Sequence, residues 1–231
     1  DVTLTHAIAT APQSVTSANF NGKLFLAYDS TVDRLHVYDP LLGTPRVRIV
    51  GFSAAPAAPT VANTGAGAYA AVLRYYRVRW AQLSGTVVIR LSEPGASVSF
   101  TPSGAGTAAR VTQPAVASEQ ETHWRVEAST DNTTFYKLSD VAIATTTYDD
   151  SAATTSYSSN AVSATACAYT NWTSVRYLLT DGNRLLGAGA WETSGARNSR
   201  VWFSPVLGTT DEADDERVPN TTTQDNWIDL N

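Results

Sequence analysis

The side chains best suited to catalysis or metal binding are few and scattered. Histidine occurs only at His6, His36 and His123, and none has a second histidine or a cysteine at metal-ligand spacing. We therefore expect each histidine to be a solvent-facing or hydrogen-bonded strand residue. The single cysteine, Cys167, allows no intrachain disulfide, and its alanine neighbours favour a small buried hydrophobe over a reactive thiol.

Carboxylates gather in two places. A run near the C-terminus contains Asp211, Glu212, Asp214, Asp215 and Glu216. It could bind a hard cation through oxygen ligands, but it lacks the alternating spacing and the glycine of a calcium loop, so we interpret it as a solvated loop. Asp149 and Asp150 are a poor candidate pair for glycoside hydrolysis, which needs two carboxylates at a defined separation.

Sequence motifs of the common enzyme classes are absent. We find no nucleophile elbow, phosphate-binding loop, dinucleotide fingerprint or zinc-protease motif. Glycosylation sequons occur at Asn132, Asn171 and Asn220, as chance predicts in a chain this rich in threonine. The sequence thus predicts a protein that is not an enzyme, with no catalytic, cofactor-binding or metal-binding residue.

The composition excludes further classes of protein. Hydrophobic residues make up 43% of the 231 residues, so the chain can bury a core, and charged residues make up only 16%. A net charge of −5 lacks the basic excess of a nucleic-acid binder, and no apolar run approaches the length of a membrane span. The chain starts at Asp1 and contains no methionine. We expect a fragment or ordered part of a longer polypeptide, with proteolytic maturation as the alternative.

Strand patterns dominate the first segment. Asn21–Gly22 is a tight-turn dipeptide that leads into an alternating strand over residues 23–28. Further strands are predicted over residues 34–38 and 46–50. Residues 51–68 are small and proline-rich, which is typical of an extended linker.

The central segment has the profile of a β-sandwich, with short strands separated by regular turns. The predicted strands are 69–80, 86–91, 97–100, 109–111, 123–129, 135–138, 145–150 and 157–162. Large strand residues usually pack inward, so Trp80 and Trp124 are expected in its core.

This segment resembles a fibronectin type III or similar bacterial and phage immunoglobulin-like domain over roughly residues 58–163. The residues that carry the resemblance are Tyr76–Trp80, Ser92–Pro94, Trp124–Asp131 and Thr145–Asp150. A short Gly/Ser-rich turn at 103–106 departs from the pattern. The resemblance implies a sandwich and says little about function, because this fold serves many roles.

The third segment repeats the first. Asp181–Gly182–Asn183 precedes a strand over 184–190, as Asn21–Gly22 precedes residues 23–28, and Arg200–Ser204 aligns with Arg34–Asp39. This spacing resembles β-propeller blades of bacteriophage tail and neck proteins. Two blades of about 40–45 residues fit outside the sandwich, fewer than a closed propeller needs.

The expected fold is all-β, with an immunoglobulin-like sandwich inserted in a partial propeller-like region. The expected domains are residues 1–57 (propeller-like), 58–163 (sandwich) and 164–231 (propeller-like).

The resemblance implies a virion structural component, such as a bacteriophage tail, nozzle or neck protein. Its expected partners are other virion proteins and further copies of itself, and host-surface glycans are a further possible partner. A carbohydrate-binding adhesion module of a tail fibre or surface protein is the alternative, and a polysaccharide depolymerase fragment ranks third. An exposed tryptophan platform in the outer segments is conceivable, although core packing or subunit contact is the favoured interpretation for most members of the set Trp172, Trp191, Trp202 and Trp227.

Overall fold

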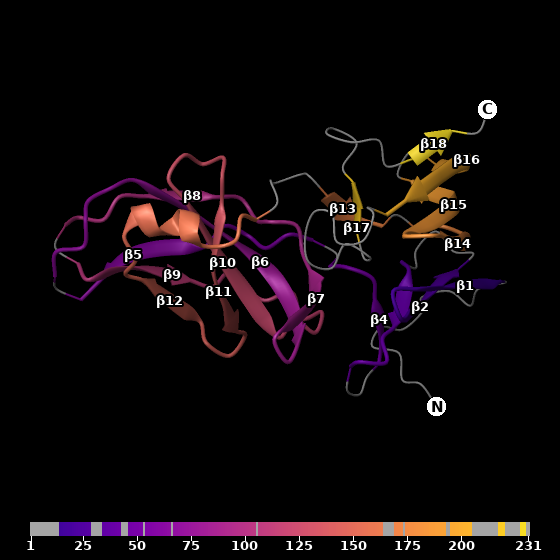
Figure 1. Cartoon of the computed structure of the whole chain (residues 1–231), viewed down its shortest axis with the longest axis horizontal. Helices are drawn as coiled ribbons and strands as arrows, with labels where there is room; N and C mark the ends of the chain where they lie inside the picture. The colour runs from indigo at the N-terminus through magenta and orange to yellow at the C-terminus, as the bar shows by residue number, and fades with distance from the viewer. Residues whose placement is uncertain are drawn as a thin grey trace. The chain divides into compact units, whose positions relative to one another are not determined.

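The computed structural model is an all-β protein built from antiparallel sheets (Figure 1). The structure describes residues 14–28, 34–42, 46–52, 54–65, 67–104, 106–163, 169–172, 174–192, 195–204, 217–219 and 227–229. The chain divides into two compact units. Unit 1 combines residues 1–51 with residues 168–231, and unit 2 comprises residues 52–167.

Unit 1 contains two four-stranded sheets. The first, which we call sheet A, has the strand order β1-β2-β3-β4 and is formed by β1 (Val15–Phe20), β2 (Lys23–Tyr28), β3 (His36–Tyr38) and β4 (Val47–Ile49). The second, sheet E, has the order β14-β15-β16-β18 and is formed by β14 (Tyr177–Asp181), β15 (Arg184–Glu192), β16 (Gly195–Phe203) and β18 (Trp227–Asp229). A separate pair joins β13 (Tyr169–Asn171) to β17 (Arg217–Pro219).

The turns of these sheets follow from local sequence. Asn21 and Gly22 both adopt positive φ, 50° and 74°, which is the conformation of the two-residue turn that matches strand twist. Gly182, at φ 53°, begins the equivalent turn between β14 and β15, where Asp181 pairs with Arg184. Both predicted turns are confirmed.

One hydrophobic core joins sheet A to sheet E. Its buried members are Ala18, Phe20, Phe25, Ala27, Leu35, Val37, Val50, Trp172, Val175, Leu185 and Trp202. The Thr16 hydroxyl donates a hydrogen bond of 2.7 Å to the carbonyl of Arg176, which adds a polar link between β1 and the start of β14. The two ends of the chain thus build one unit around one core.

Unit 2 consists of two sheets that share a second core. The larger sheet has the order β11-β10-β6-β7, with β8 also paired to β6, and the smaller has the order β12-β9-β5. Their strands are β5 (Thr60–Thr64), β6 (Arg74–Ser84), β7 (Val87–Leu91), β8 (Val98–Phe100), β9 (Ala108–Thr112), β10 (His123–Ser129), β11 (Tyr136–Ala142) and β12 (Thr147–Asp150). Trp80 and Trp124 lie directly opposite each other on β6 and β10 and are buried in this core, as predicted.

Two predictions within unit 2 are wrong. Residues 51–68 are not only a linker, because Phe52 is fully buried in the core and residues 60–64 form β5, paired with β9. Residues 157–162 are not a continuous strand, and only Val162 among them forms an isolated antiparallel bridge, with Tyr136. A 3-10 helix, η1, spans Thr154–Ser159, and the Ser156 hydroxyl bonds back to the Ala153 carbonyl at 2.7 Å. Serine side chains that bond nearby backbone compete with strand pairing, which explains the error.

Candidate functional site

The histidines of the described chain have structural environments. His36 is fully buried in β3, with its Nδ1 atom 3.1 Å from the Arg34 carbonyl and its ring in edge contact with Tyr28 at 5.3 Å between centroids. The Nδ1 atom of His123 lies 2.9 Å from the Thr122 hydroxyl. Within the described residues no three His, Cys, Asp or Glu side chains are grouped as metal ligands would be. His6, Cys167 and the acidic run at 211–216 lie outside the described residues.

Asp149 and Asp150 have separate roles on β12. Asp149 is partly exposed and forms a two-pronged ion pair with Arg110, with both contacts at 2.7 Å. The hydrogen bond from Arg110 lowers the pKa of Asp149. Asp150 is buried. Neighbouring strand residues point to opposite faces of a sheet, so the two carboxylates do not converge on one substrate position.

Asp150 is the centre of a buried cluster of tyrosine hydroxyls. Its Oδ2 atom accepts hydrogen bonds from Tyr76 at 2.7 Å, from Tyr69 at 3.2 Å and from Tyr157, and Oδ1 accepts from the Ala152 amide at 3.0 Å. Burial, reinforced by the negative charge of Asp150, raises the pKa of Tyr76 and of Tyr157. The phenols therefore stay protonated and act as donors. The cluster joins β6, β12 and η1 through buried hydrogen bonds, which is a structural role.

A second set of charges lies on the face of the larger sheet that points away from the core. Arg77 Nε donates to Glu127 at 2.6 Å, and Arg79 lies 3.7 Å from the other oxygen of the same carboxylate. On the next strand pair, Arg125 and Lys137 contact Asp140 at 2.7 and 2.6 Å. Burial alone would raise the pKa of Asp140, but the hydrogen bonds and charges of Arg125 and Lys137 outweigh it, so the pKa is lowered.

A hollow of about 300 Å³ lies beside this network, lined by Arg77, Gly95, Ala96, Ser97, Asn132, Thr133 and Phe135. Its polar and aromatic groups are already engaged. The Arg77 guanidinium stacks 3.9 Å from the centre of the Phe135 ring, and the Ser97 hydroxyl donates to Asn132 Oδ1 at 2.7 Å. Phe135 is only 3% exposed, so its ring offers no platform to a sugar.

The tryptophans whose side chains the structure describes are core residues. Trp172 and Trp202 are buried in unit 1, as Trp80 and Trp124 are in unit 2. The side chains of Trp191 and Trp227 lie outside the described set. None of the four described indoles can form the exposed carbohydrate platform considered above.

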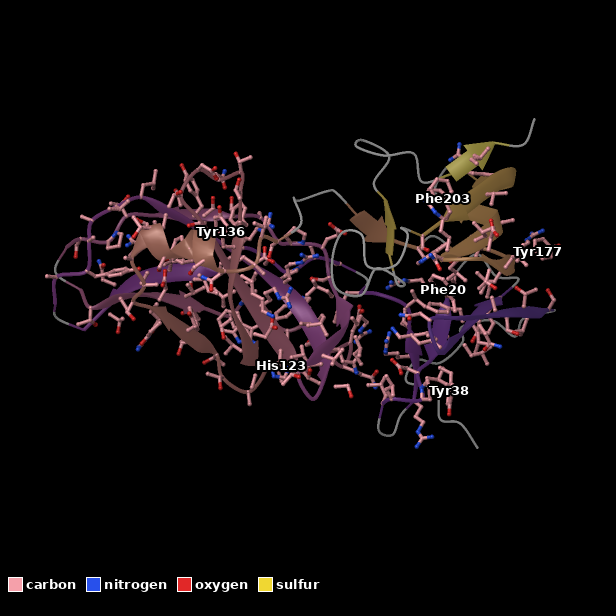
Figure 2. The ribbon with its side chains drawn as sticks, viewed as in Figure 1. Phe20, Tyr38, His123, Tyr136, Tyr177 and Phe203 are labelled. Carbon is pink, nitrogen blue, oxygen red and sulfur yellow. The ribbon has the colours of Figure 1, made fainter. Side chains whose placement is uncertain are left out.

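The most unusual surface is the outer face of sheet E, which points away from the core of unit 1. Strand register places two cross-strand rows there: Tyr177, Ala188, Val201 and Ile228 in one, and Leu179, Leu186 and Phe203 in the other. Every member is apolar. Figure 2 labels Tyr177 and Phe203, whose side chains project from β14 and β16. We call these seven residues the apolar face.

The apolar face is open to solvent. Tyr177, Leu179 and Ile228 are 59%, 63% and 58% exposed, and the other four are partly buried. A hollow of about 330 Å³ is lined by Tyr177, Leu178, Leu179, Leu186, Gly187, Ala188 and Val201. A sheet with one exposed face usually has polar residues on that face and apolar residues on the buried one. Apolar residues on both faces are typical of a sheet that is covered on both sides.

This surface is not among the features predicted from the sequence, although the sequence carries a signal for it. Adjacent apolar residues such as Leu178–Leu179 and Leu185–Leu186 cannot both point to the same face of a strand. Consecutive apolar residues on strands are typical of sheets covered on both faces.

No family model matches the sequence, and no curated protein matches it significantly. None of the helices in the described part of the chain is long and apolar enough to cross a membrane.

Proposed function

We propose that the chain is a structural component of a bacteriophage virion, in the tail, nozzle or neck, where unit 1 makes subunit contacts and unit 2 is a displayed immunoglobulin-like domain. The observation that carries the assembly role is the apolar face of sheet E. Seven apolar positions on a solvent-facing sheet are costly for a free monomer and useful in a protein that is covered by a neighbour.

The organisation of the chain supports the same proposal. Unit 1 is built from both ends of the chain, and unit 2 is inserted between residues 51 and 168. Sheets A and E are each four-stranded and antiparallel, and they share one hydrophobic core. Such sheets resemble successive propeller blades, whose two faces are both covered. The phage assignment itself rests on the sequence resemblance.

The chemistry of the described residues supports a non-catalytic role. The buried carboxylates Asp150 and Glu127 and the partly buried Asp140 are each held by tyrosine or arginine partners within the fold. Groups held in this way stabilise the protein and are not poised to bind a substrate.

The test is the location of the protein in particles. Phage purified on a density gradient from the source culture would be labelled with gold-conjugated antibody to unit 2, and preimmune serum would be the control. We expect label at the tail or neck and co-migration with the particles. Presence of the protein only outside particles would contradict the proposal. Sugar release from a host polysaccharide would favour the depolymerase fragment. Specific binding of the protein to a glycan array would favour the adhesion module.

A further inference from the structure

We propose that the apolar face is a self-association surface, on which a second copy of this chain packs through the same sheet E in a two-fold arrangement. This inference rests on the proposed assembly role and assigns the surface and its occupant.

The protein already buries one side of sheet E in an apolar core. Leu185 of β15 and Trp202 of β16 share that core with residues of sheet A, such as Phe20 and Phe25. The rows on the opposite side of sheet E are apolar as well. An apolar sheet surface can be covered by another such surface, because aligned sheets interdigitate their side chains.

A protrusion and a hollow lie side by side on the apolar face. Tyr177 and Leu179 project from the edge strand β14 and are well exposed, whereas Ala188 at the centre is small and partly buried. The hollow of about 330 Å³ between them can accept a large apolar side chain. An isologous interface presents the same patch on both copies. The protruding side chains of each copy can therefore enter the hollow of the other.

The two rows of the apolar face carry no charge. The chain has a net charge of −5, yet no side chain of these rows is of an acidic or basic residue. At the end of the face, Asp181 pairs in register with Arg184, and the Arg184 guanidinium lies 5.0 Å from the centre of the Phe203 ring. This rim has one charge of each sign, so two copies meet without the repulsion of like charges.

The size of the face sets the expected strength. Seven side chains are fewer than the roughly 20–30 residues per partner of a standard interface, so we expect a weak dimer that depends on concentration. In a particle, several contacts of this kind act together, and the second contact forms at high effective concentration.

The first experiment is sedimentation of the chain over a wide concentration range. We expect a monomer–dimer equilibrium that Leu179→Lys weakens at least tenfold, because the substitution places a charge within the apolar face. Leu41→Lys is the matched control, since Leu41 is 73% exposed on unit 1 but outside sheet E. Ile228→Lys, on the opposite edge of the sheet, is the second variant and should have the same effect as Leu179→Lys. Far-ultraviolet circular dichroism and thermal unfolding establish that each variant folds.

The second experiment locates the contact. Ala188→Cys in a Cys167→Ser background, treated with a short bis-maleimide, should give covalent dimers that Leu179→Lys suppresses. Tyr136→Cys on unit 2 in the same background should not cross-link efficiently.

Several outcomes would overturn the inference. One is a wild-type monomer at every concentration, and another is dimerisation that Leu179→Lys and Ile228→Lys leave unchanged. If the wild type is monomeric but Leu179→Lys is lost from particles, a different virion protein covers the face. That result would reject the second copy and leave the proposed function standing. A protein that dimerises as expected but is absent from particles would reject the proposed function alone.

Discussion

The Tyr76 hydroxyl donates a 2.7 Å hydrogen bond to Asp150 Oδ2 and thereby joins the two sheets of unit 2. Tyr76 lies on β6 of the larger sheet and Asp150 at the end of β12 of the smaller one. Tyr69 and Tyr157 donate to the same oxygen, so a single carboxylate organises three hydroxyls inside the unit.

Replacing the central carboxylate should therefore destabilise unit 2. Three tyrosine hydroxyls donate to one oxygen of Asp150. Asp150→Asn replaces a carboxylate oxygen by an NH2 group, which is itself a donor, so at least one hydroxyl loses its acceptor. We expect a loss of about 2–3 kcal/mol in the free energy of unfolding, measured by urea denaturation followed by tryptophan fluorescence. Asp149→Asn is the control on the same strand, because its ion pair with Arg110 is exposed and should change stability by less than about 1 kcal/mol. Equal effects of the two substitutions would contradict the assigned role.

Breaking the buried charge network should also be costly. Glu127 accepts from Arg77 at 2.6 Å and lies 3.7 Å from Arg79, and all three side chains are almost fully buried. Glu127→Gln leaves two guanidinium groups without their counter-charge, and we expect a loss of about 3–5 kcal/mol in the same denaturation assay. A charge-neutral double variant, Arg77→Met with Glu127→Leu, leaves Arg79 and should recover part of that loss. A Glu127→Gln protein as stable as the wild type would show that the network contributes little.

The stability of unit 2 should fall in acid partly through Asp140. Its pKa is lowered in the folded protein by Arg125 and Lys137, against the opposing effect of burial. The Asp140 carboxyl has a pKa of about 3.9 in the unfolded chain, so in acid the unfolded state binds more protons than the folded one. The stabilisation is complete above pH about 4–5 and is lost as the pH falls through the lowered folded value. Asp140→Asn should therefore be less stable than the wild type at neutral pH, and the difference should shrink towards pH about 2. A constant difference at every pH would contradict this account.

Close packing behind the apolar face makes Gly187 sensitive to substitution. A Cβ atom added there would lie 3.0 Å from Trp172 and 3.0 Å from Val175, both buried in the core of unit 1. Gly187→Ala should cost about 1–3 kcal/mol, because side chains in a packed core must shift to accept the methyl group. The neighbouring Ala188→Val is the matched control, since it adds volume on the open side of the same strand. We expect it to change thermal stability little, and a larger loss than for Gly187→Ala would reverse the assigned faces of β15.

Much of the architecture follows from local sequence. Alternation and turn chemistry predict most of the strands, and Asn21–Gly22 and Gly182 place two hairpins because positive φ is readily available there. Trp80 and Trp124 are large aromatic residues on strands with an alternating residue pattern, which predicts their burial, and both are buried.

The remaining features depend on contacts between residues far apart in sequence, which no local pattern encodes. Strand β5 forms in a proline-rich stretch because β9 offers it a partner, and residues 157–162 do not form a strand because Tyr157 turns inward to Asp150. The apolar pairs of β14 and β15 were visible in the sequence, but cross-strand register alone aligns them with Val201 and Ile228 into one exposed surface. The all-β character of the chain and its turns follow from the sequence, because they depend on neighbouring residues. Which faces are buried, which charges meet and which apolar surface stays exposed depend on the tertiary structure, because those contacts join residues far apart in the chain.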